Sequence, residues 1–222
     1  MNKECNHLKR KLPRALILLL AGIVVGLAAS GLLHALTDLS LFGENAGLKR
    51  TSAADNAHLS ARAYEVLENI KDNDFSALSR VAHPQKGVLF SPCATVSPEI
   101  NKRFLPKQLA AFGTDTNVYI WGVASIDGRP IEMAPLEYIN GVVYDRDYIM
   151  ASTIGINTII KSGNALENVT EEFPDMRFVD FFVPGYEGGT AEDLSWGILR
   201  LGFESDKDEY KLTLILNSSW TG

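Results

Sequence analysis

The segment 195-SWGILRLGFESDKDEYKLTLILN-217 carries the strongest fold signal in this sequence. Two runs in which apolar residues alternate with polar or small ones flank the polar turn Asp206–Glu209. An alternation of period two is typical of half-buried β-strands, so the segment predicts an antiparallel hairpin with one face against a core. The residues expected on that core face are Leu199, Leu201, Phe203, Leu212, Leu214 and Leu216.

Upstream of this hairpin, short segments with the pattern of helices or strands follow one another between turns. Apolar residues at helical spacing predict helices over 56–73, 75–82, 106–112, 135–143 and 164–173. β-Branched and aromatic residues predict strands over 88–91, 118–123 and 177–183. Residues 148–160 are mostly apolar without a clean period, and both a strand and a buried loop remain open. Together these segments predict one α+β domain in which a few helices pack on an antiparallel sheet.

Near the start of the chain, Ala15–Leu36 is an apolar stretch of 22 residues without a formal charge. A helix of this length spans roughly 33 Å, which is enough for a bilayer core of about 30 Å. The stretch therefore predicts a transmembrane signal-anchor whose partner is the lipid bilayer. The expected organisation is a basic tail at 1–14, the span at 15–36, a juxtamembrane linker at 37–56 and the α+β domain at 57–222.

The charges beside this stretch predict its orientation. Five basic residues and one acid, Glu4, precede it, and the positive-inside rule keeps such a flank in the cytoplasm. The domain is then extracytoplasmic, on the outer side of the inner, or cytoplasmic, membrane. A cleaved signal peptide, with a small-residue site near Ala28–Ser30 or Leu33–Ala35, is the alternative, although the apolar run is longer than a usual signal-peptide core.

Composition excludes several classes of function. The chain has a formal net charge of −6 and no basic cluster with interleaved aromatic residues after residue 50, so nucleic acid is not an expected partner. On the predicted topology, Cys5 and Cys93 lie on opposite sides of the membrane and cannot pair with each other. The four histidines lack a zinc-ligand spacing and no serine has a Gly-x-Ser-x-Gly setting, so we expect neither a metal cofactor nor a serine hydrolase.

Several motifs in 83–222 resemble those of a group of bacterial exported proteins that has no assigned activity. The matching segments are His83–Val88, Phe90–Pro92, Tyr119–Gly122, Val143–Asp147, Leu199–Glu204 and Trp220–Thr221. The order of helices, strands and a long final hairpin is similar to the nuclear transport factor 2-like, or cystatin-like, cone. The resemblance implies that fold and no catalytic residue. Cys93 and Asn217 depart from the group, in which an aromatic residue and a histidine are usual, and this argues against shared chemistry at that histidine.

A pocket in such a cone would draw on six residues, which are His83, Trp121, Asp127, Tyr144, Asp145 and Trp220. A histidine titrates near neutrality and could pair with Asp127 or Asp145 for acid/base catalysis. Each residue also has a plainer interpretation. A histidine before a proline commonly anchors a loop, Asp145 can form an ion pair with Arg146, and aromatic residues in short strands commonly belong to the core.

Three functions remain open at this point. We favour a membrane-tethered extracytoplasmic domain that binds an envelope protein or a small ligand, because the sequence has a clear membrane anchor and no clear set of catalytic residues. The alternatives are a small-molecule lyase or isomerase that uses a cone pocket, and an assembly component of a bacterial secretion system. A deep polar pocket in a structure would favour the enzyme.

Overall fold

The structure is a computed structural model that describes residues 52–124, 128–163, 165–185 and 195–219. The predicted tail, the predicted span and the linker as far as residue 51 lie outside the described residues, and so do Asp127 and Trp220 of the predicted pocket. The described residues belong to one compact unit that begins at Ser52. No helix among them has the length and apolar character needed to cross a membrane.

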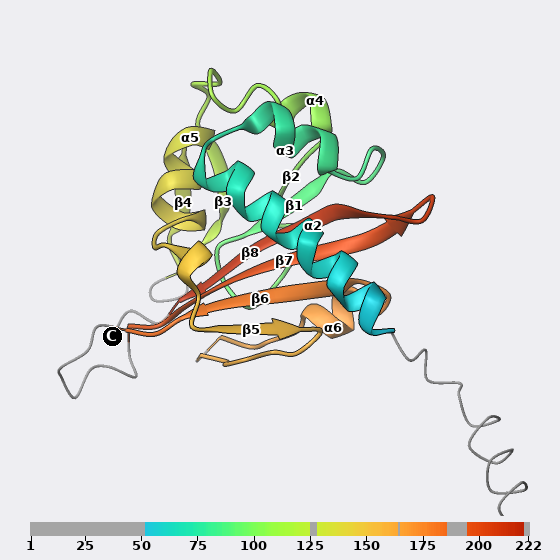
Figure 1. The fold of residues 1–222 in the computed structure, drawn as a ribbon. Helices are drawn as coiled ribbons and strands as arrows, with labels where there is room; N and C mark the ends of the chain where they lie inside the picture. The colour runs from blue at the N-terminus through green and yellow to red at the C-terminus, as the bar shows by residue number, and fades with distance from the viewer. Residues whose placement is uncertain (1–51, 125–127, 164, 186–194, 220–222) are drawn as a thin grey trace, which may run out of the picture. The chain divides into compact units, whose positions relative to one another are not determined.

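A six-stranded sheet forms the centre of this unit, with the strand order β2-β1-β8-β7-β6-β5 (Figure 1). Its strands are β1 Val88–Ser91, β2 Lys102–Phe104, β5 Thr153–Ile156, β6 Arg177–Val183, β7 Gly197–Asp206 and β8 Glu209–Ser219. The predicted α+β class is confirmed. The prediction of a purely antiparallel sheet is wrong, because β1 pairs in parallel with β8. Residue alternation reports which faces are buried and is the same for both pairing directions, so it could not reveal this pair.

The predicted final hairpin is confirmed as the antiparallel pair β7–β8. Leu199, Leu201 and Phe203 of β7 all belong to the main core, as predicted. In β8, however, Leu212 lies opposite Phe203 and Leu214 lies opposite Gly202, so Thr213 is an extra residue in a β-bulge. The bulge shifts the alternation, and Leu214 and Leu216 join a second apolar cluster. The prediction that they share the core face of Leu212 is therefore wrong.

The helix α2 (Ala53–Lys71) crosses one face of the sheet in Figure 1. It begins before the predicted start, because the Ser52 hydroxyl caps it by accepting a hydrogen bond from the Asp55 N–H at 3.0 Å. The next helix, α3 (Phe75–Val81), is capped by Asp74 as predicted. The side chains that α2 buries are Leu59, Ala63, Val66, Leu67 and Ile70.

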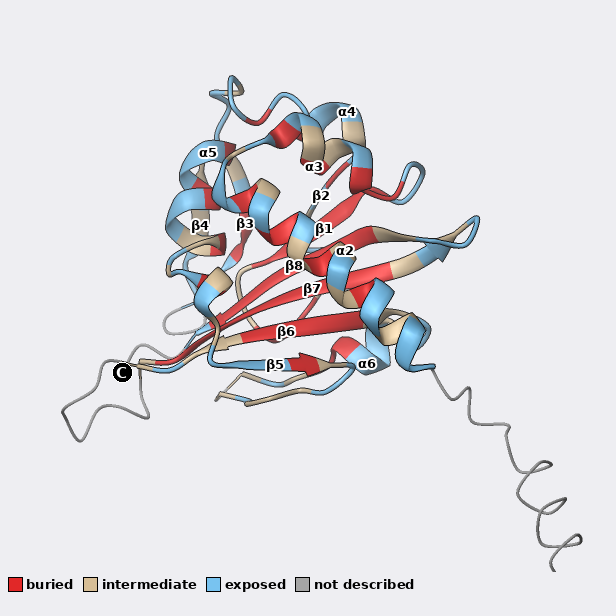
Figure 2. Cartoon of the chain, viewed as in Figure 1, coloured by how far each residue is buried: buried red, intermediate tan, exposed pale blue. Residues whose placement is uncertain are grey.

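Burial is concentrated between α2 and the sheet and extends toward α4 (Pro106–Leu109) and the two-stranded sheet of β3 (Tyr119–Val123) and β4 (Pro130–Met133) (Figure 2). Aromatic rings fill this end of the core. The rings in contact there are those of Phe90, Phe104, Phe112, Trp121 and Tyr138, all at most 1% exposed. Side chains of the described residues therefore pack closely at this end of the core.

The remaining segments refine the sequence predictions. The helix predicted over 135–143 consists of α5 (Pro135–Tyr138) and a π-helical turn, η1 (Ile139–Val143). The undecided stretch 148–160 holds a 3-10 turn, η2 (Tyr148–Met150), and the strand β5. The helix predicted over 164–173 is shorter, because α6 (Val169–Glu172) begins after Asn168.

Candidate functional site

The second face of the six-stranded sheet carries a smaller apolar cluster that is bordered by a groove. The buried members of this cluster are Leu89, Val96, Val169, Leu214 and Leu216, with Phe173 and Met176 packed against them. The groove has a volume of about 390 Å³, at the small end of the range for ligand sites. The residues that line it are Lys86, Arg103, Phe173, Glu204 and Thr213.

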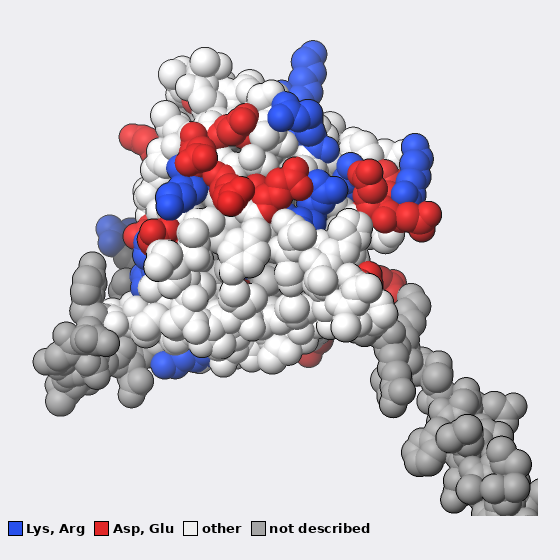
Figure 3. All heavy atoms as spheres, in the orientation of Figure 1, with Lys and Arg blue, Asp and Glu red and all other residues white. Residues whose placement is uncertain are grey.

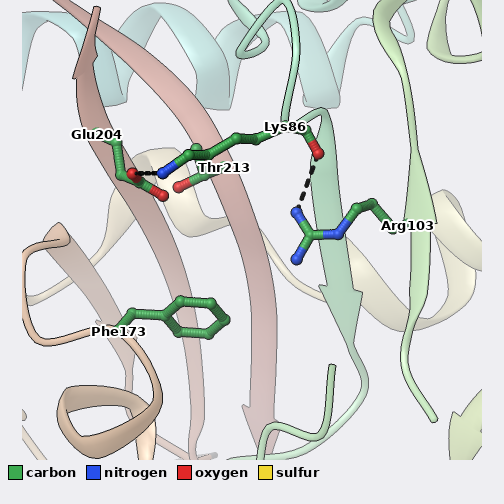
Figure 4. Close-up of a pocket in the computed structure, with 5 residues that line it drawn as sticks. All are labelled: Lys86, Arg103, Phe173, Glu204 and Thr213. Carbon is green, nitrogen blue, oxygen red and sulfur yellow. Dashed lines mark hydrogen bonds and ion pairs between the residues drawn. The ribbon is translucent and has the colours of Figure 1, made fainter. Parts of the chain in front are cut away.

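Five separate parts of the fold bring these side chains together. Lys86 lies in the turn before β1, Arg103 on β2, Glu204 on β7, Thr213 at the bulge of β8, and Phe173 directly after α6. Figure 4 shows the Lys86 side chain reaching toward Glu204, the Arg103 guanidinium at the Lys86 backbone carbonyl, and the Phe173 ring below them. The groove thus combines charged groups on one side with an apolar wall on the other.

The turn that holds Lys86 is fixed by His83. The His83 Nδ1 accepts hydrogen bonds from the backbone N–H groups of Gln85 and Lys86, at 3.2 and 3.1 Å. Gly87 closes the turn with a φ of 65°, a left-handed conformation that favours glycine. Lys86 then forms an ion pair with Glu204. His83 therefore acts as a loop anchor that positions a groove residue.

Arg103 is the distinctive group of the site. Its Nη1 donates to the backbone carbonyl of Lys86 at 3.1 Å, and within the described residues it forms no ion pair with a carboxylate. Burial of the guanidinium lowers the pKa of Arg103, and the charge of Glu204 offsets this in part. Among the described residues, its Nε and Nη2 have no hydrogen-bond partner. Arg103 is exposed, and a cation with unused donors that lines a groove is suited to binding an anion.

The predicted pocket residue Trp121 belongs to the core. Its indole is 0% exposed and stacks on the ring of Tyr138, with centroids 3.8 Å apart and planes 3° from parallel. The indole Nε1 donates to the carbonyl of Met133 at 3.0 Å. Trp121 therefore has its polar atom satisfied and its ring covered.

The predicted residue Asp145 lies in a polar network with Tyr148 and Asn217. Its Oδ1 accepts from the Tyr148 hydroxyl at 2.8 Å and from the Asn217 Nδ2 at 3.2 Å, while its Oδ2 accepts from the Arg146 Nη2 at 2.8 Å. Burial raises the pKa of Tyr148, so its phenol stays protonated and keeps donating. Both carboxylate oxygens are engaged by donors, which suits an anchoring group better than a catalytic base.

The other predicted pocket residues do not converge. The Tyr144 hydroxyl donates to Asp147 at 2.7 Å, and Asp127 and Trp220 lie outside the described residues. The His83 N–H donates to the Leu212 carbonyl, whereas Asp145 contacts Asn217, five residues farther along β8. At the rise of a β-strand this separation is about 17 Å, so His83 and Asp145 do not form an acid/base pair.

Sequence reasoning missed most of the groove. Lys86 and Glu204 belong to two of the matching motifs, but nothing in the sequence indicated that these motifs meet. Arg103 lies on a strand of three residues that is too short to show a period. Phe173 was expected inside a helix and instead follows α6. Among the described residues, no group of three Asp, Glu, His or Cys side chains lies close enough together to hold a metal ion.

Comparisons with known proteins complete these observations. No family model and no curated protein matches the sequence. One similar solved structure is a protein from Streptomyces avermitilis, named a "putative dehydratase from the NTF2-like family". It is 12% identical, with 77% of this chain and 100% of that chain covered and a TM-score of 0.29. A TM-score below 0.5 does not establish a common fold, so the likeness carries no argument about this site.

Proposed function

We propose that this chain is a membrane-tethered binding domain of the bacterial envelope, and that the groove around Arg103 is its ligand site. The observation that carries the binding role is the exposed Arg103 guanidinium at the groove, whose one described hydrogen bond goes to a backbone carbonyl. A ligand anion would satisfy its unused donors. The wall formed by Phe173 would cover the apolar part of such a ligand.

The tether in this proposal is the uncharged stretch Ala15–Leu36, with its basic flank in the cytoplasm. The groove is then extracytoplasmic. A cone of the nuclear transport factor 2-like type is the finer fold proposal, supported by the order of two helices, short strands and a long final hairpin. Assembly into a secretion system stays an alternative that is supported by this outline alone.

The lyase or isomerase alternative has less support. It requires an available acid/base group in a pocket, and Asp145 has both oxygens bonded while His83 holds a turn. Trp121, which the sequence suggested as a pocket residue, is packed inside the core. An enzyme would have to rely on other residues.

Cysteine labelling tests the tether. In a background with Cys5→Ser and Cys93→Ser, we expect Lys107→Cys, which is exposed on α4, to react with an impermeant maleimide in intact cells. Asn6→Cys in the basic tail should react only after lysis. A mature protein whose N-terminus lies near Ser30 or Leu36 by mass spectrometry would replace the anchor with a cleaved signal.

Complementation of a deletion strain tests the groove. Arg103→Gln should fold, reach the membrane at normal abundance and fail to complement, because it removes the cation and leaves the strand intact. Arg80→Gln, on the exposed side of α3, is the matched control and should complement. Full complementation by Arg103→Gln together with failure of a folded His83→Gln or Asp145→Asn would instead favour an enzyme.

A further inference from the structure

We infer that the groove binds a carboxylate ligand with a single negative charge and an apolar body. The carboxylate contacts Arg103 and the apolar body packs on Phe173. This inference rests on the proposed function, because it names the ligand class of the same groove. It draws on the charges, the donor geometry and the apolar wall of the five lining residues.

The net charge of the groove residues favours a ligand with one negative charge. Lys86 and Glu204 form an ion pair and neutralise each other, which leaves the charge of Arg103. A second negative charge on a ligand bound at Arg103 would be repelled by Glu204, whose charge already acts on Arg103. Like charges at short range repel more strongly where solvent is partly excluded. A carboxylate monoanion is therefore favoured over a phosphate dianion.

The geometry of Arg103 favours a planar anion. Its Nη1 donates to the Lys86 carbonyl at 3.1 Å, which anchors one nitrogen of the guanidinium. The Nε and Nη2 donors form the side of the fork that has no described partner, and this side matches the two oxygens of a carboxylate. The turn anchored by His83 holds that carbonyl in place. One end of the Arg103 guanidinium is thus anchored before the ligand arrives.

The rest of the groove favours an apolar ligand body. Phe173 is half-buried and packs on the apolar cluster that contains Leu214 and Val169, so its ring is a supported wall. The Thr213 hydroxyl donates to the Gly202 carbonyl at 3.3 Å and offers only an acceptor to a ligand. A volume of about 390 Å³ accommodates a small molecule or the end of a chain.

Isothermal titration tests the inference on the full chain in lipid nanodiscs, with the heats of empty nanodiscs subtracted. The probes are 3-phenylpropionate, its neutral amide, acetate and inorganic phosphate. We expect 3-phenylpropionate to bind most tightly, and the amide, acetate and phosphate each to bind at least about tenfold more weakly, since each lacks the apolar body or the monovalent carboxylate.

Single substitutions test which groove residue contacts which part of the ligand. Arg103→Gln should weaken 3-phenylpropionate binding by about tenfold or more, and Arg103→Lys should recover part of it, because a point charge replaces a fork. Phe173→Leu should weaken 3-phenylpropionate and leave acetate unchanged. Arg80→Gln should alter neither. Circular dichroism and the thermal midpoint show whether each variant is folded.

Three results would overturn the inference, which are equal binding of the acid and its amide, tighter binding of phosphate, and no binding of any carboxylate. If Arg103→Gln still fails to complement the deletion strain, the ligand class is wrong and the proposed binding function stands. If Arg103→Gln complements fully as well, the groove is not the site and both proposals fail.

Discussion

At the scale of single residues, the charged side chain of Arg200 is buried, with 1% of it exposed, and it lies between two carboxylates. Its Nε and Nη2 donate to Asp180 at 2.6 and 2.9 Å, and its Nη1 donates to Glu167 at 2.7 Å. Burial alone would lower the pKa of Arg200, but the two carboxylates raise it above its ordinary value. Arg200 therefore stays charged and joins β7 to β6 and to the segment before α6.

We predict that Arg200→Leu destabilises the fold strongly, because it leaves Asp180, which is 0% exposed, without its partner. Removing one member of a buried pair typically costs about 3–5 kcal/mol, measurable by urea unfolding. Arg80→Leu on the surface should change stability by about 0.5 kcal/mol or less. The double variant Arg200→Leu with Asp180→Leu should recover part of the loss. If Arg200→Leu alone is at least as stable as the double variant in urea unfolding, the two residues are not coupled.

At the scale of elements, the bulge at Thr213 decides which layer each β8 side chain joins. Leu212 lies in the main core beneath α2, and Leu214 lies in the second cluster with Val169 of α6. One strand thus contributes to both apolar layers, and Thr213 reaches the groove at the point where the change occurs. A regular strand would have carried Leu212 and Leu214 on the same face.

A double-mutant cycle tests this arrangement. Leu212→Ala and Leu214→Ala should each cost about 2–5 kcal/mol in urea unfolding, because both side chains are at most 1% exposed. Only Leu214→Ala should couple with Val169→Ala, by about 0.5–3 kcal/mol, since contacting residues are not additive. Coupling of Val169 to Leu212 instead would restore the regular alternation that the sequence suggests.

What the sequence could predict was local. The Asp74 cap and the β7–β8 hairpin depend on neighbouring residues, and both are present as predicted. The parallel β1–β8 pair, the short strand β2 and the bulge depend on contacts between distant segments, and local periodicity does not encode such contacts. The groove depends on all three of these features, so it was missed. Of the predicted pocket residues that the structure describes, His83 and Asp145 are anchors and Trp121 belongs to the core.

At the scale of the whole molecule, charge and attachment set how the domain meets its surroundings. In Figure 3, side chains of both signs gather over α2, α3 and α5, and the area over β5 and β6 is mostly uncharged. The chain as a whole is acidic, with a net charge of −6. An anionic ligand is therefore not attracted from a distance, and its binding depends on the local contact with Arg103.

Arg177, at the start of β6, binds the first turn of α2, where the described unit begins. Its Nη1 donates to Asp55 and to the Tyr210 hydroxyl, each at 2.5 Å, and its Nη2 donates to Asn56. The Tyr210 hydroxyl also donates to Asp55 at 2.7 Å. This cluster fastens the first turn of α2 to β6 and β8. On the proposed topology, any pull from the membrane tether enters the domain at this turn.

We predict that Arg177→Gln frees the first turn of α2 without unfolding the domain. Amide hydrogen exchange of the full chain should become faster over 55–59, because the ion pair and two further hydrogen bonds are lost, and should remain slow in the paired residues of β7 and β8. Arg62→Gln removes an ion pair with Glu65 on the same helix and should leave the exchange at 55–59 unchanged. Unchanged protection in Arg177→Gln would show that packing of Leu59 alone holds the turn. Equal loss of protection in β7 and β8 would show that the turn and the sheet unfold as one unit, and the domain would then have no separate point at which the tether could detach a single element.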